Sequence, residues 1–337
     1  MGWPVRVLAL ISGLLLLLAT SCNAGQAIGI YYLTQDDATV SSVSTAVQQA
    51  SYVAGYAERL TWDIVEPAIG SYDWSIPDSF VSLAKSTGKN LTISIQAGYR
   101  TPSWVYAAGA QSFSFLWDRS DFGPALGTPT LIPVPWDGTF LAAWISFEQA
   151  LISRYGNCPT VVQIKATGLN AQTQETSLPN GTTDTANWIS IGYTRAKVLN
   201  AWEAMMAPLA DPREFATMFV ATTFPPIDDN GNQIQGMSSD SVLNAEMLAF
   251  GDGTYPTEFV AQNNGLSSSF VWQPLVNPPV LGHGVGFQAV GVLGAGLSAA
   301  LTNAIQANGH YVELYPSDLQ SDPQGILMAA NTALAAN

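Results

Sequence analysis

Residues 161–175 read VVQIKATGLNAQTQE, and this stretch indicates the fold most clearly. Its first seven residues are mostly apolar and β-branched, which is typical of a short buried strand. A polar loop that carries Glu175 follows, and a longer segment with helical spacing comes after Trp188. A strand, a loop and a helix in this order form one βα unit of a parallel sheet.

The same unit recurs along the chain. Eight short apolar runs are each followed by a loop and then a longer segment, and several of these segments are clear helices. The expected strands are residues 27–33, 52–59, 91–96, 161–167, 215–222, 258–262, 285–290 and 311–315. About 250 residues is the usual size of a closed barrel of eight βα units. We therefore predict a single-domain (β/α)8 barrel of the TIM type over residues 25–337.

Three helices are predicted from the spacing of apolar residues. The first begins after Asp137 as N-cap, and its apolar stripe ends at Ile152. The second contains residues 297–305, and Gly309 is expected to close it. The third follows Trp188, and its apolar face is expected to contain Ile191, Val198, Trp202 and Met205.

Two long loops, residues 101–135 and 225–257, follow expected strands. In barrels of this type the loops after the strands build the active site. An open doubly wound sheet is the alternative fold, but its dinucleotide fingerprint is missing, because Gly291, Gly294 and Gly296 have the reversed spacing. No Pro-rich or Ser-rich linker divides the chain, so one domain is expected.

Composition excludes several classes of protein. Of the 337 residues, 47% are hydrophobic and 11% charged, a balance that excludes intrinsic disorder. The 11 Lys and Arg residues against 25 Asp and Glu give a net charge of −14, so nucleic acid is not an expected partner. Ten Trp, 12 Tyr and 13 Phe residues suit the recognition of neutral, partly apolar ligands such as sugar rings.

Residues 1–24 have the features of a secretory signal peptide. Arg6 supplies one positive charge, residues 7–19 form an apolar run, and small residues precede Ala24. The run is too short to span a membrane, so we expect a secreted protein without a membrane span. Cys22 stands where a bacterial lipoprotein carries its lipid, so a lipid anchor remains an alternative. Cys158 then has no disulfide partner, and the core alone must hold the fold.

Common catalytic and cofactor motifs are absent from the sequence. It contains no GxxxxGK[ST] loop, no HExxH helix and no GxSxG elbow. With two His residues and no spaced Cys/His set, neither a metal nor a cofactor is expected. His310 begins a strand and is interpreted as structural, and for His283 a surface or core role is favoured over a place in a pocket.

Two carboxylates fall near the C-terminal ends of expected strands. Glu313 lies inside the apolar, aromatic run 311–315, where an unpaired carboxylate would be costly. A purely structural explanation is that Glu313 pairs with Arg59 or Arg100 and braces the barrel. Glu175 lies in a polar loop, where a solvated surface role is equally reasonable. Because perturbed carboxylates gather at functional sites, both are candidates for catalysis.

A family resemblance rests on residues 59–75, RLTWDIVEPAIGSYDWS. This segment resembles the second-strand region of clan A glycoside hydrolases, notably the family 42 and family 35 β-galactosidase-like barrels, where W-x-x-x-E-P-x-x-G-x-Y-D-W-S precedes a helix. The continuation GKNLTISIQAG at 88–98 and TPSW at 101–104 is similar to the third strand of those barrels. The resemblance extends over residues 27–170 and is thin beyond them.

The resemblance implies a retaining glycosidase in which Glu175 is the acid/base after strand four and Glu313 the nucleophile. The sequence departs from the family pattern in two ways. The family's acid follows Asn directly, whereas Asn170 is followed by Ala171. The family's nucleophile ends strand seven, whereas Glu313 is expected on strand eight.

Cleavage of a glycosidic bond needs one protonated carboxylic acid and one ionised carboxylate, and the two glutamates supply this pair. Arg59 is expected to hold the nucleophile ionised. The other expected substrate-binding residues stack on sugar rings or reach their hydroxyl groups: Trp62, Gln96, Trp104, Trp136, Asn264, Gln288 and Tyr315. For each Trp, packing in the core is at least as reasonable a role as stacking on a sugar.

Three functions therefore remain open. The first is an exported glycoside hydrolase acting on an oligosaccharide or polysaccharide. The second is a catalytically inactive carbohydrate-binding barrel, exported or lipid-anchored, which the missing Asn-Glu dipeptide favours. The third, a polysaccharide lyase or serine hydrolase, would require His283 in the pocket.

Overall fold

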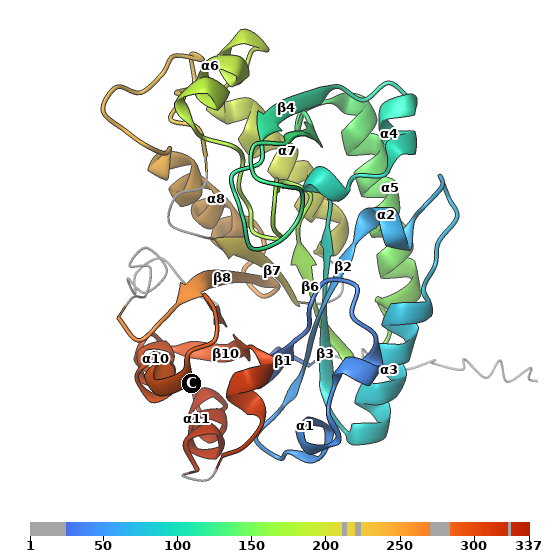
Figure 1. The fold of residues 1–337 in the computed structure, drawn as a ribbon, viewed down its shortest axis with the longest axis vertical. Helices are drawn as coiled ribbons and strands as arrows, with labels where there is room; N and C mark the ends of the chain where they lie inside the picture. The colour runs from blue at the N-terminus through green and yellow to red at the C-terminus, as the bar shows by residue number, and fades with distance from the viewer. Residues whose placement is uncertain (1–24, 211–213, 220–223, 270–283, 323–324) are drawn as a thin grey trace, which may run out of the picture.

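A computed structural model describes residues 25–210, 214–219, 224–269, 284–322 and 325–337. Eight parallel strands close into a barrel in the order β1-β10-β9-β8-β7-β6-β3-β2 (Figure 1). The strands are β1 (Gly29–Leu33), β2 (Gly55–Thr61), β3 (Asn90–Gln96), β6 (Val161–Ala166), β7 (Glu214–Phe219), β8 (Phe259–Leu266), β9 (Val285–Ala289) and β10 (Gly309–Leu314). Each overlaps one of the eight expected strands, so the predicted TIM-type barrel is confirmed; residues 220–222 of the fifth expected run lie outside the described residues.

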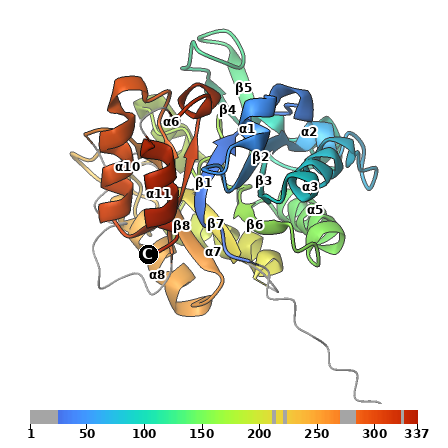
Figure 2. The same ribbon diagram turned by 90° about the horizontal axis from the view of Figure 1, so that it is seen from below.

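Helices surround this barrel, as Figure 2 shows. Six of them lie outside the strands: α3 (Ser75–Thr87), α5 (Gly138–Tyr155), α7 (Arg195–Met206), α8 (Ser241–Thr254), α10 (Leu297–Gln306) and α11 (Ile326–Leu334). The other α-helices are α1 (Thr45–Gln49), α2 (Trp62–Val65), α4 (Ser103–Ala107) and α6 (Thr182–Ser190).

The buried apolar residues form two clusters, one between the barrel and its helices and one inside the barrel. Ile30 and Tyr32 belong to the large cluster shared with the helices, whereas the alternating residues Tyr31 and Leu33 belong to a small one that includes Tyr311. This alternation follows from the period of two along a strand. The interior cluster is small because many inward positions carry polar side chains, and these form the candidate site.

The loop expected over residues 101–135 has structure of its own. It contains α4 and an antiparallel hairpin of β4 (Ser112–Leu116) and β5 (Pro129–Pro133). Phe113 and Phe115 are buried while their neighbours are exposed, the alternation of a half-buried strand. Figure 1 shows β4, α4 and α6 on one side of the molecule and α1 on the opposite side. The loop expected over 225–257 contains α8.

The helix predictions were partly wrong. Asp137 caps α5 as expected, accepting hydrogen bonds from the backbone N–H groups of Thr139 and Phe140. Trp188 lies within α6, which ends at Ser190, and a separate helix, α7, begins at Arg195. Gly192 between them adopts a φ of 81°, and Ile191 is exposed rather than buried. At the end of α10 the left-handed residue is Asn308, and Gly309 already begins β10.

The expected export signal, residues 1–24 with Cys22, lies outside the described residues. Among the helices that the structure does describe, none is both long and apolar enough to cross a membrane.

Candidate active site

Both candidate carboxylates lie where parallel strands end. Glu313 is the residue before the last of β10, the eighth strand of the barrel, and Gln288 lies on β9, the seventh. Glu175 lies in the loop after β6, the fourth strand. Glu313 is buried, with 2% of its surface exposed, whereas Glu175 is half-buried.

Two amides on β8 join these carboxylates. Asn264 donates through Nδ2 to Glu175 Oε1 at 2.9 Å and to Gln288 Oε1 at 3.3 Å. Gln262 donates through Nε2 to Asn264 Oδ1 at 2.7 Å and to Glu313 Oε2 at 3.0 Å. Each amide nitrogen thus uses both of its protons. We call this chain, from Glu175 through Asn264 and Gln262 to Glu313, the amide bridge.

A buried lysine holds the other oxygen of Glu313. Lys165 Nζ on β6 lies 2.9 Å from Glu313 Oε1, and each side chain is 2% exposed. The same ammonium donates to Gln163, to Gln262 and, at 2.9 Å, to the hydroxyl of Tyr311. Burial lowers the pKa of Lys165, and the charge of Glu313 opposes that shift.

A third carboxylate lies further down the barrel interior. Glu214, at the start of β7, accepts hydrogen bonds from the side chain of Gln163 and the backbone N–H of Ala27. Burial raises its pKa to about 7, against the effect of these hydrogen bonds and of Lys165. Glu214 and Glu313 therefore face one buried cation, Lys165, and burial favours the protonated form of Glu214.

Arg59 does not contact Glu313, contrary to the prediction. Its Nε lies 3.3 Å from Asp36 Oδ1 and donates to the carbonyl of Thr34 at 2.9 Å. Arg100 pairs instead with Asp63, at 3.2 Å, and Asp37. The cation that neutralises Glu313 is Lys165, because β6 rather than β2 directs a basic side chain toward it.

Arg59 still belongs to the rim of the site. Asp36, its partner, accepts a hydrogen bond from Gln174 Nε2 at 3.4 Å. Gln174 precedes Glu175 and also bonds to Ser94 of β3. This network ties the loop that carries Glu175 to the ends of β1, β2 and β3.

Gln96 and Tyr315 also lie at this end of the barrel. Gln96 ends β3 and is fully buried, and neither atom of its amide has a hydrogen-bond partner among the described residues. A buried amide without partners can accept and donate to ligand hydroxyl groups. Tyr315 follows β10 and packs against the interior apolar cluster, two residues beyond Glu313.

The three tryptophans expected to stack on sugars have other neighbours. Trp62 is fully buried, and its indole N–H donates to Glu66 Oε2 at 2.9 Å. Trp104 packs edge-on against Trp62 and donates to the Glu66 carbonyl. Trp136 packs against aromatic residues of the α6–α7 region, Trp188 and Tyr193. Trp62 is therefore a core residue, since no face of its ring reaches solvent, and the contacts of the other two are with the outer layer.

The loop of the β4–β5 hairpin extends toward Glu175. Trp117 packs against Tyr99 with ring centroids 4.8 Å apart, and the Tyr99 N–H donates to the carbonyl of Ala171 in the loop after β6. The hydrogen bond to Asp121 is the main cause that raises the pKa of Arg119, and the charge of Glu175 adds to it. The hairpin loop thus places a cation within electrostatic range of Glu175.

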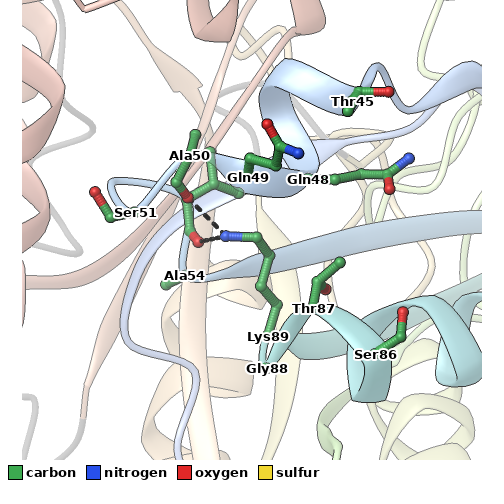
Figure 3. A pocket seen from close by; sticks show the side chains of 11 residues that line it. Thr45, Gln48, Gln49, Ala50, Ser51, Ala54, Ser86, Thr87, Gly88 and Lys89 are labelled. Carbon is green, nitrogen blue, oxygen red and sulfur yellow. Dashed lines mark hydrogen bonds between the residues drawn. The ribbon is translucent and has the colours of Figure 1, made fainter.

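A cavity of about 740 Å³ lies away from these carboxylates, among α1, the end of α3 and the segment before β2 (Figure 3). Lys89 points into it but donates to the carbonyls of Ala50 and Val53, so its charge is already solvated. No carboxylate lines this cavity, and it holds no catalytic group.

Within the described residues, no three His, Cys, Asp or Glu side chains come together as a metal site. His283, expected at the surface or in the core, lies outside those residues. His310 is half-buried at the start of β10, and burial lowers its pKa.

Lys165, Gln262 and Tyr311 were not predicted from the sequence. Lys165 has a readable pattern, because Gln163, Lys165 and Thr167 alternate with apolar residues in a strand and so share one face. Gln262 lies two residues before Asn264 and faces the same way. The alternation did not identify the inward face in advance, because both faces of a barrel strand are buried and either can carry apolar residues.

Comparison with known proteins bears on the fold. No protein-family model matches this chain, and no curated protein matches it in sequence. Its structure is similar to that of an exo-β-1,4-mannosidase from Opitutaceae bacterium strain TAV5, with a TM-score of 0.50 and 11% identity. The match covers 94% of this chain but 62% of the mannosidase chain, so this chain spans less than two thirds of that enzyme's length. At this identity the similarity shows the TIM-type fold alone.

Proposed function

We propose that this protein is a glycoside hydrolase in which Glu175 is the acid/base and Glu313 the nucleophile. The observation that carries the proposal is the amide bridge, which joins the two carboxylates at the C-terminal end of the barrel. In TIM barrels this end holds the active site. The similarity to a mannosidase barrel supports the same class of enzyme.

The two carboxylates have different surroundings, as the reaction requires. Glu313 has a cation beside one oxygen and an amide donor on the other, which suits the carboxylate that attacks or stabilises the anomeric carbon. Glu175 is half-buried in a loop and accepts one amide hydrogen bond, so it remains accessible to a leaving group. This division supports a retaining mechanism through a glycosyl intermediate on Glu313.

The proposed substrate is a neutral oligosaccharide or polysaccharide. Uncharged polar side chains lie at the same end of the barrel: Gln288 accepts a hydrogen bond from Asn264 of the amide bridge, Gln96 ends β3, and Tyr315 follows β10. Such groups recognise sugar hydroxyls through hydrogen bonds and sugar rings through aromatic contact. We further propose export through residues 1–24, which N-terminal sequencing of protein from the producing cell tests; labelling with a fatty acid tests a lipid on Cys22.

The direct test is hydrolysis of a panel of aryl glycosides and polysaccharides, with β-mannosides included, by the purified protein. Glu175→Gln and Glu313→Gln should each lower kcat by about a thousandfold or more while binding persists. The anomeric configuration of the first product, followed by proton NMR, should match that of the substrate. Inversion would contradict the assignment of Glu313 as nucleophile.

One observation favours a second candidate, a non-catalytic carbohydrate-binding barrel. Both oxygens of Glu313 are occupied by partners within the barrel, and only 2% of the residue is exposed. In that case the unmodified protein would bind glycans without turnover, and Glu313→Gln would change its stability rather than its affinity. Binding measured by calorimetry on the same panel separates the two candidates.

A further inference from the structure

We infer that Lys165 is the positioning residue that supplies the counter-charge of Glu313 and orients it for catalysis, the role expected of Arg59. This inference rests on the proposed function and names a residue that neither the sequence resemblance nor the site prediction included.

The contacts of Lys165 and Glu313 constrain the positions of both side chains. Lys165 Nζ forms an ion pair with Glu313 Oε1 at 2.9 Å while its protons go to Gln163, Gln262 and Tyr311, and Gln262 Nε2 donates a hydrogen bond to Glu313 Oε2 at 3.0 Å. The ammonium is itself held by Tyr311, which also donates to Gln262 Oε1 at 2.6 Å. Lys165 and Gln262 are thus parts of one network, and the lysine cannot move without disturbing the amide bridge.

The other titratable groups near Glu313 do not supply its counter-charge. Tyr311 on the same strand and Tyr31 on the adjacent β1 face it, and burial raises the pKa of both phenols, so they stay neutral. Glu214, from β7, faces the same interior with its pKa raised to about 7. Arg59 is paired with Asp36. Among the described residues, Lys165 is the cation in contact with Glu313.

Breaking a buried ion pair leaves one charge without compensation. If Lys165 loses its charge, Glu313 takes up a proton more readily, and a protonated carboxyl is a poor nucleophile. The acid limb of the kcat/KM profile, which reports ionisation of the free enzyme, should then move to higher pH. A lysine that merely fills space would leave that limb in place.

The experiment compares the full chain with Lys165→Met, Lys165→Gln and, as a matched control, Lys197→Met, whose ammonium is exposed on α7. Lys165→Gln retains a donor, which provides a second variant if the methionine variant does not fold. We expect the acid limb to move up by about one to three pH units in both Lys165 variants and not in the control. Lys165→Arg, which retains the charge, should restore most of the original profile.

A measurement independent of turnover accompanies the kinetics. Carbon-13 NMR of the glutamate carboxyls, with Glu313 assigned through Glu313→Gln, should show Glu313 protonating at higher pH in the folded Lys165 variants. An unchanged Glu313 titration and an unchanged acid limb would overturn the inference. Absence of turnover by the unmodified protein would overturn the proposed function instead, and the NMR titration would then decide whether Lys165 sets the charge of Glu313.

Discussion

Gln262 and Asn264 are separated by one residue on β8, and the period of two along a strand turns both amides to the same side. Neither residue is charged, yet between them they contact Glu175, Gln288 and Glu313. An amide supplies two donors and one acceptor, so it can link two carboxylates without adding charge to a buried site. The orientation of the candidate acid/base therefore depends on a neutral residue.

Replacing Asn264 by Ala should therefore lower kcat/KM by roughly tenfold to a hundredfold, the effect of losing a hydrogen bond to a charged group. Steady-state kinetics on the best aryl glycoside measures this. Gln49→Ala removes an exposed amide from α1, on the far side of the molecule, and should leave kcat/KM unchanged. Equal effects of the two substitutions would show that Asn264 has no special role.

At the level of elements, the loop after β3 supports the loop that carries Glu175. Gly98 has a φ of 46°, and a Cβ there would lie 2.2 Å from the carbonyl oxygen of Ala171. That carbonyl also accepts a hydrogen bond from the N–H of Tyr99 at 3.0 Å. The close approach of two backbones requires glycine at this position.

Gly98→Ala should accordingly displace residues 168–175 and reduce both stability and activity. Gly88→Ala is a matched control, since Gly88 has a φ of 65° and a Cβ added there would meet no atom within 4 Å. The control should lose about 1–2 kcal/mol of unfolding free energy, the cost of the left-handed conformation alone, with unchanged kcat/KM. Gly98→Ala should lose more and show impaired turnover; the same loss for both variants, by denaturant unfolding, would refute the close contact.

The eight strands were predictable because each is a short apolar, β-branched run, and Asp137 marked the start of α5 correctly. The β4–β5 hairpin was missed because Phe113 and Phe115 alternate over too few residues to stand out in a long loop. The expectation that Trp62 stacks on sugar rings was wrong for another reason. Composition does not tell which way Trp62 of α2 points, and only its packing against Trp144 and Phe147 of α5 buries it.

The candidate site was predictable only in part. Glu313 stood out because a charged residue in an apolar run needs a partner, but the partner itself lies on β6, 148 positions earlier in the chain, and no local pattern connects the two. The closure of the barrel, which sets β6 across from β10, makes this contact. Long-range charge pairing is therefore the part of the site that the sequence concealed.

On the scale of the whole molecule, the buried carboxyl of Glu214 should make stability depend on pH. Its pKa is about 7 in the folded protein and 4.5 when unperturbed. Between these values the unfolded chain releases the proton that the folded chain retains, so the unfolding free energy falls as pH rises from about 4.5 to 7. The fall amounts to about 3 kcal/mol, which is fully present as stability below pH 4.5.

Glu214→Gln tests the predicted fall in unfolding free energy, because the substitution removes the titrating group. Burial also raises the pKa of Glu58 and Glu148, and their effect remains in both proteins, so the difference between the two pH profiles isolates Glu214. Urea unfolding at several pH values should give a profile that is flatter for the variant. Parallel profiles would mean that Glu214 is ionised in the folded state.

Trapping of the glycosyl intermediate tests whether Glu175 and Glu313 together cleave a glycosidic bond. Incubation with a 2-deoxy-2-fluoro glycoside of the best substrate, followed by mass spectrometry of the digested protein, should place one sugar on Glu313. Glu175→Gln should still form this adduct from an activated substrate but release it slowly. A sugar attached to another residue, or no adduct while hydrolysis proceeds with inversion, would contradict the account.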